Sequence, residues 1–192
     1  MSLLIVGLAL FLSLHSTAIF APERRSNIIR QIGERWWKVL YSVASLISLA
    51  LIIYGYAEAR QSPIWLWQPP VAMRHTALLL TLIAFILLAA TYVPGNRLKS
   101  RVGHPMLLAV KFWALAHLLA NGTLADLLLF GSFLVWGVAG FVIRRKRDRI
   151  NGVTYPAGGM SKDITVIIAG LASWAVFAMY LHVVLIGISP MP

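Results

Sequence analysis

Six apolar segments constrain this chain more than any other feature of its sequence. They cover residues 2–20, about 37–57, about 75–93, 104–122, about 123–143 and about 164–188. Runs of roughly 20 apolar residues are what an α-helix needs to cross the hydrocarbon core of a bilayer. Hydrophobic residues make up 59% of the chain and charged residues only 12%. The sequence therefore predicts an all-α, polytopic membrane helix bundle of about six transmembrane helices, forming one integral membrane domain over residues 1–192.

The distribution of Lys and Arg predicts the orientation of this bundle. The connections after the first, third and fifth apolar segments carry 14 of these residues, the remaining connections carry two, and Lys111 lies inside a segment. Loops rich in Lys and Arg face the cytoplasm. We therefore expect both termini outside the cytoplasm. The basic run RRKRDR at 144–149 is expected to stop its helix and to contact lipid head groups, rather than to bind nucleic acid.

Three further features complete the expected organisation. The first apolar segment has no basic residue before it and no small-x-small cleavage pattern after it, so it is interpreted as a retained helix. Residues 58–74 are too polar and proline-rich to span, and Trp65 and Trp67 favour a position along the membrane interface. The chain has no cysteine, which excludes disulfides and cysteine nucleophiles.

The most informative stretch for function runs from His104 to Gly122 and reads HPMLLAVKFWALAHLLANG. Ionisable groups within apolar helices are costly and are functional candidates by default. His117 is the leading candidate because Ala114 and Ala120 flank it at helical spacing and leave room for a flat group. The alternative is that His117 only hydrogen-bonds a neighbouring helix.

Two other ionisable residues in apolar segments have simpler explanations. Lys111 is expected to extend towards the cytoplasmic interface. Asp126, three residues after Thr123, is expected to form a capping box at a helix start rather than to act as a catalytic carboxylate.

Several stretches carry a resemblance to a known family. They are LHS at 14–16, GERWWKVLYSVASLISLALIIYGY at 33–56, GHPMLLAVKFWALAHLLANG at 103–122, and LLLFGSFLVWG at 127–137. On these the chain is identified as a member of the NnrU family of bacterial inner-membrane proteins. The resemblance is strongest over residues 1–143, with an additional C-terminal helix at about 164–188. The family name implies a link to nitrite and nitric oxide metabolism in denitrifying bacteria.

The NnrU family is similar to the zeta-carotene isomerases, which are haem b enzymes with histidine axial ligands. This similarity implies haem b as a cofactor, a small apolar substrate in the bilayer, and His15 and His117 as the ligands of the haem iron. The redox-sensitive cysteine that the isomerases can use near the second histidine is absent here, and Ala114 stands one turn before His117, so ligand exchange with a thiolate is not available.

The depth of each histidine in the membrane favours a different second ligand beside His117. At 1.5 Å per residue, His15 and His117 differ in depth by about 12 Å. His182, in the last apolar segment, lies at about the same depth as His117. The two arguments leave His15 and His182 as open alternatives for a second ligand.

Two other classes of function remain. The basic loop and Gly103-His104-Pro105 resemble part of the isoprenylcysteine-type membrane methyltransferases, although the tyrosine and glycine that follow in that motif are missing. A non-enzymatic membrane factor for the expression or assembly of respiratory reductases also fits the family name.

Overall fold

The structure is a computed structural model that describes residues 1–191. Within these residues it is helical apart from its connections and one isolated bridge between Trp65 and Thr123. Five helical stretches are long and apolar enough to cross a membrane. They are α1 (Ser2–Phe20), α3 (Glu34–Gln61), α4 (Val71–Tyr92), α7 (Leu124–Ile150) and the C-terminal stretch Met160–Ile186. The predicted polytopic bundle is confirmed. The shorter apolar helix α6 (Pro105–Ala120), fourth along the chain, accounts for the remaining one of the six predicted segments.

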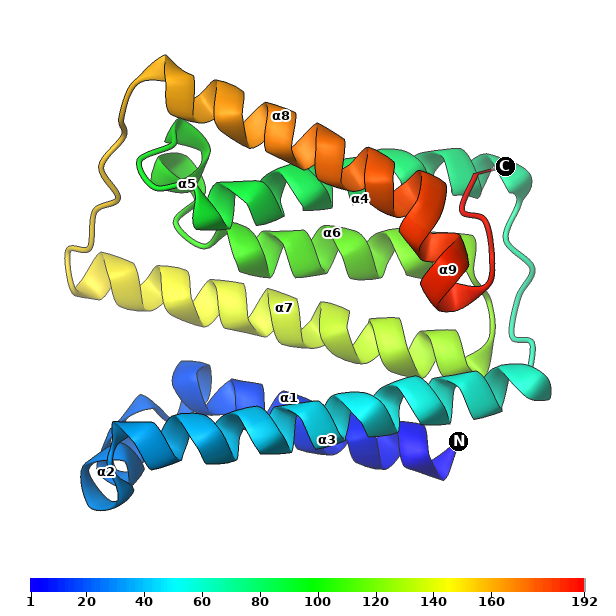
Figure 1. Cartoon of the computed structure of the whole chain (residues 1–192), viewed down its shortest axis with the longest axis horizontal. Helices are drawn as coiled ribbons and strands as arrows, with labels where there is room; N and C mark the ends of the chain where they lie inside the picture. The colour runs from blue at the N-terminus through cyan, green and yellow to red at the C-terminus, as the bar shows by residue number, and fades with distance from the viewer. Residues whose placement is uncertain (192) are drawn as a thin grey trace.

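The six stretches form a row in which neighbours run antiparallel, except α1 and α7, which run parallel (Figure 1). Helix α3 packs on α1, α1 on α7, α7 on α6, α6 on α4, and α4 on α8 (Met160–Val176). Both ends of the chain lie on the side where α1 begins and α6 ends, and the basic connections lie at the opposite ends of the helices (Figure 1). This arrangement matches the alternation of charge along the sequence. Large apolar side chains remain exposed along the helices, for example Ile53 (61%) and Leu79 (64%), as expected where lipid completes the packing.

Several helices are longer than the apolar segments that predict them. Helix α3 includes Glu58–Gln61, α4 begins at Val71 rather than His75, and the last stretch begins at Met160 rather than 164. The prediction that RRKRDR stops its helix is wrong, because α7 continues through these residues to Ile150. Lys and Arg are good helix formers, and positive charge stabilises the carboxyl end of a helix. The hydrocarbon boundary therefore ends the apolar run without ending the helix.

The basic connections also contain two helices. Helix α2 (Pro22–Ile32) follows α1 directly, and its proline occupies the first helical turn, where the missing N–H costs nothing. Helix α5 (Arg97–Val102) is capped by the Asn96 side chain, which accepts a 2.7 Å hydrogen bond from the Lys99 N–H. Both helices lie at the end of the bundle away from the termini (Figure 1).

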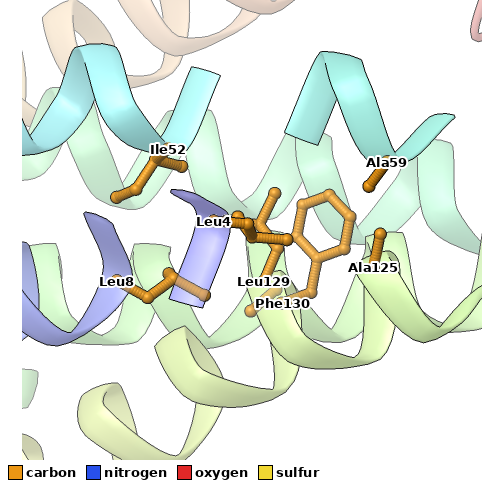
Figure 2. Close-up of a cluster of buried hydrophobic side chains, with 8 residues drawn as sticks. Leu4, Leu8, Ile52, Ala59, Ala125, Leu129 and Phe130 are labelled. Carbon is orange, nitrogen blue, oxygen red and sulfur yellow. The ribbon is translucent and has the colours of Figure 1, made fainter. Parts of the chain in front are cut away.

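The main apolar core lies where α1, α3 and α7 meet (Figure 2). Leu4 and Leu8 of α1 pack with Ile52 of α3 and with Leu129 and Phe130 of α7. Close approach of α1 and α3 depends on Gly55, since a Cβ at that position would lie 2.2 Å from the Leu4 nitrogen. Small residues at such crossings are typical of helix contacts in membranes.

Helix α6 has 16 residues and a length of about 24 Å. The segment between α3 and α4 covers its carboxyl end. The N–H groups of Leu66 and Leu124 donate 2.8 Å hydrogen bonds to the carbonyls of Gly122 and Ile64, respectively. Gly122 is required here because a Cβ would lie 2.0 Å from the Trp67 carbonyl oxygen. The segment predicted to lie along the interface thus also closes one end of the bundle.

Candidate functional site

His117 lies near the carboxyl end of α6, with its ring against α7. Its Nδ1 is 2.8 Å from the Trp113 carbonyl oxygen one turn earlier. A backbone carbonyl only accepts hydrogen bonds, so this contact places the proton on Nδ1 and leaves the Nε2 electron pair free. The Asn121 side chain donates a 2.9 Å hydrogen bond to the His117 carbonyl and completes the last turn of α6.

The flat group beside His117 is part of the protein itself. The Phe130 ring of α7 stacks on the imidazole, with centroids 4.5 Å apart and planes inclined by 25°. Ala114 is fully buried and belongs to the apolar core. The room that small neighbours were expected to leave is therefore filled by protein on this side of the ring.

His15 has a similar local geometry on α1. Its Nδ1 is 2.8 Å from the Phe11 carbonyl oxygen, and the imidazole stacks on the Phe11 ring with centroids 4.0 Å apart. Tyr41 of α3 lies on another side of the ring, 5.4 Å away between centroids. His15 thus has the same tautomer as His117 and also presents Nε2.

Aromatic side chains separate His15 from His117. Phe133 of α7 lies 5.8 Å from Phe11 and 5.5 Å from Trp113, measured between ring centroids. Trp113 in turn lies 5.2 Å from His117. Helices α1 and α6 both pack on α7 and do not pack on each other. The structure therefore does not place these two histidines face to face.

His182 begins α9 (His182–Ile186), directly after the π-helical segment η1 (Phe177–Leu181). Its Nδ1 is 2.6 Å from the Ile188 carbonyl oxygen. Helix α9 lies at the end of the bundle where α6 ends (Figure 1). The π-helical segment was not predicted from the sequence; it is a rare element that often occurs at functional sites.

Lys111 and Asp126 have the surroundings expected of non-catalytic groups. The Lys111 ammonium lies 5.0 Å from the centroid of Phe141, towards the basic end of the bundle. Asp126 forms the predicted capping box: its carboxylate accepts from the Thr123 N–H, and the Thr123 hydroxyl accepts from the Asp126 N–H.

A second polar cluster lies at the basic end and joins three separate segments. His104, the N-cap of α6, has Nε2 2.8 Å from Asp148 Oδ2 of α7, and the Tyr155 hydroxyl donates a 3.0 Å hydrogen bond to the same oxygen. Burial lowers the pKa of His104, although the Asp148 carboxylate acts in the opposite direction. Burial, together with the hydrogen bond to Asp148, raises the pKa of Tyr155. His104 could be singled out from the sequence, but its partners could not, because Asp148 is the one acidic residue within the basic run RRKRDR.

Within residues 1–191, no three His, Asp or Glu side chains gather closely enough to hold a bare metal ion. His15, His117 and His182 are instead separate imidazoles, each with Nδ1 within hydrogen-bond distance of a backbone carbonyl. Such groups supply one axial bond each to the iron of a haem. The donor chemistry therefore fits a haem ligand at His117, whereas the aromatic side chains between His117 and His15 do not fit a haem clamped by those two.

Comparison with known proteins identifies the family. No curated protein and no solved structure matches the chain. The family described as NnrU protein matches residues 3–190, so the match also includes the last helical stretch. The protein belongs to the NnrU family, as an integral membrane protein of that family.

Proposed function

We propose that this protein is a membrane haem b protein in which Nε2 of His117 would bind the iron. The observation that carries this proposal is the contact between His117 Nδ1 and the Trp113 carbonyl oxygen. Metal-binding histidines characteristically donate their other ring N–H in this way, which fixes the tautomer and the ring orientation. Phe130 stacks on one face of the ring and restricts its rotation.

His182 is the better supported second ligand. It begins α9, which lies at the same end of the bundle as the carboxyl end of α6, where His117 is located. Its Nδ1 also contacts a backbone carbonyl, so its Nε2 is available. The isomerase resemblance favours His15 instead, but pairing His15 with His117 would require Phe11, Phe133 and Trp113 to move.

The family name suggests a metabolic role for such a haem centre. A haem iron supplies a site that binds small nitrogen oxides or promotes isomerisation of a polyene in the membrane. In this chain, the Trp113 carbonyl would orient the ligand ring, and Trp113 and Phe130 would keep water away from it. We accordingly propose a role in nitrite and nitric oxide metabolism at the bacterial inner membrane, or an isomerase-like reaction on a small apolar substrate.

The test is the visible spectrum and haem content of the full chain, purified in detergent after expression with sufficient haem supply. The wild type should show a Soret band, and His117→Ala should lose it at an unchanged membrane yield. The matched control is His75→Ala, because His75 is an exposed histidine at the start of α4. Wild-type protein without any Soret band would instead favour a non-enzymatic membrane factor.

A further inference from the structure

Helix α2 has little packing of its own within the part of the chain that the structure describes. It contacts only α1 and α3, the two helices that adjoin it in sequence, and none of its residues is buried. It has 11 residues, and isolated helices shorter than about 12–15 residues are marginal in water. Packing of one face against another surface normally supplies the missing stability. Helix α2 therefore needs a surface beyond α1 and α3.

One side of α2 carries apolar and basic side chains together. Arg24, Ile28 and Ile32 follow one another at four-residue spacing, so they lie on the same side of the helix. Ile28 is 40% exposed and Ile32 is 37% exposed. The opposite side is polar, and there the Arg30 guanidinium donates a hydrogen bond to the Asn27 side chain. The surface that α2 needs must accept both isoleucine and arginine.

The positive charge around α2 is not neutralised by the protein. Residues 22–38 contain five Lys or Arg side chains and two Glu. Glu34 pairs with Lys38 at 2.7 Å. In residues 1–191, no carboxylate lies within ion-pair distance of Arg24 or Arg25.

Helix α5, the other short basic helix at this end of the bundle, is different. It packs on α4, α6 and α8. Arg97 pairs with Asp163 at 3.5 Å, and Lys99 Nζ donates a 3.1 Å hydrogen bond to the Thr91 carbonyl. Basic residues at this end can therefore be bound by the protein itself, and those of the α2 side that carries Ile28 are not.

Both ends of α2 are tied to the membrane interface. Only Ala21 separates it from α1, a helix long and apolar enough to span the bilayer. Trp36 and Trp37 follow α2 at the start of α3, and Trp36 is 63% exposed. Tryptophan is enriched where the bilayer meets water. The Arg25 guanidinium lies 5.8 Å from the centroid of the Trp37 ring, so the basic side of α2 lies at the same level. The surface within reach of α2 is therefore that of the bilayer.

We propose that α2 lies in the plane of the membrane interface and binds anionic phospholipids of that leaflet. Ile28 and Ile32 enter the boundary between head groups and acyl chains, as in other amphipathic interfacial helices. Arg24 and Arg25 donate hydrogen bonds to the lipid phosphates, which guanidinium groups bind in a bidentate manner. The charge distribution assigns α2 to the cytoplasmic side, where the leaflet has a negative surface potential. This assignment is independent of the haem proposed at His117.

The test is amide hydrogen exchange of the full chain in nanodiscs of phosphatidylglycerol and in nanodiscs of phosphatidylcholine. Exchange over residues 23–32 should be about twentyfold slower in phosphatidylglycerol, because each of two arginines near an anionic surface contributes about a factor of five. Residues 125–137 of α7 are the control and should exchange equally in both lipids. Equal exchange of wild-type α2 in the two lipids would overturn the proposal.

Two single variants with the same loss of charge test which side of α2 binds lipid. Arg24→Gln should reduce the ratio of exchange rates between the two lipids about fivefold. Arg30→Gln is the matched control on the opposite side of the same helix, and it should change this ratio less than twofold. The ratio also cancels any effect of the substitutions on the helix itself. Equal effects of the two variants would contradict the assigned side.

A third variant tests the apolar contact. Ile28→Ser/Ile32→Ser retains every charge and, because both side chains are exposed, should leave the bundle folded. Exchange of α2 should be faster than in wild type in both lipids. Unchanged exchange would overturn the proposed insertion. Protection of wild-type α2 in a nonionic detergent equal to that in phosphatidylglycerol would also overturn the proposal, since anionic lipid would then not be needed.

Discussion

Tyr56 of α3 donates a 2.5 Å hydrogen bond to Oδ1 of Asp126, the acidic residue that caps α7. The other carboxylate oxygen of Asp126 accepts from the Thr123 N–H and hydroxyl. Asp126 is only 4% exposed, so each of these donors offsets part of the cost of burying the carboxylate. The Asp126 side chain thus caps the amino end of α7 and links this helix to α3.

Replacing Tyr56 with Phe should destabilise the bundle by about 2 kcal/mol, because a buried carboxylate oxygen loses its donor. The measurement is unfolding of the purified protein in mixed detergent micelles. Tyr54→Phe is the control, since Tyr54 lies on the same helix and is 75% exposed. If the two variants were equally stable, the bond between Tyr56 and Asp126 would not support the fold.

The basic run at the end of α7 contains two kinds of residue. Arg147 donates a 2.7 Å hydrogen bond to the Ile19 carbonyl, and Arg144 lies 3.5 Å from the Ala18 carbonyl, both at the carboxyl end of α1. Lys146 and Arg149 are exposed. Neutralising Arg144 and Arg147 to Gln should therefore cost about 2 kcal/mol of stability. Neutralising Lys146 and Arg149 to Gln should lower the stability by less than about 0.5 kcal/mol, although this variant loses the same two positive charges. Equal destabilisation of the two double variants would contradict the assigned contacts to α1.

The cluster at His104 should make the basic end of the bundle sensitive to acid. Burial lowers the pKa of folded His104 below the ordinary value of 6.5, so protonation favours the unfolded state. The stabilisation is complete above pH 6.5 and is lost as the pH falls through the pKa of the folded protein. Asp148, Arg144 and Tyr155 surround the ring, and the opposing effect of Asp148 limits the loss.

The measurement is hydrogen exchange at residues 97–104 and 148–155 between pH 7.5 and 5.5. Protection should fall with pH in the wild type and stay nearly constant in His104→Gln. The control His75→Gln should behave like wild type, because His75 is exposed. A wild-type profile in His104→Gln would assign the pH dependence to another group.

The orientation of the bundle is open to a direct test. The split of 14 basic residues against two and the shared end of the two termini predict that a C-terminal reporter lies outside the cytoplasm. Paired fusions of alkaline phosphatase and green fluorescent protein measure this. An active phosphatase and a dark fluorescent protein are expected, whereas the reverse pattern would invert the topology.

The sequence predicts the helices well and their partners poorly, for a physical reason. Each apolar run is also a helix, and α1 has the predicted bounds of residues 2–20. The ends of the helices are predicted less well, because the residues Glu58–Gln61 of α3 and the basic run of α7 remain helical beyond the hydrocarbon core. The capping box at Asp126 was predicted because it is local in sequence.

The contacts of the candidate site depend on which helices become neighbours. Phe130 against His117, Tyr56 at Asp126 and Asp148 at His104 each join residues of different elements. Helical periodicity gives no information about such pairs. The depth of a histidine along its helix follows from the rise per residue alone, so the offset between His15 and His117 could be predicted from the sequence.

The central claim is that Nε2 of His117 binds the haem iron, and chemical rescue tests it most directly. His117→Gly removes the ring and leaves a cavity of imidazole size beside Phe130. Haemin is titrated into this variant in detergent, with and without millimolar imidazole, and the Soret band is recorded. We predict weak haem binding without imidazole and recovery to about one haem per chain with it. Haem binding by His117→Gly at the wild-type level without imidazole would contradict the assignment.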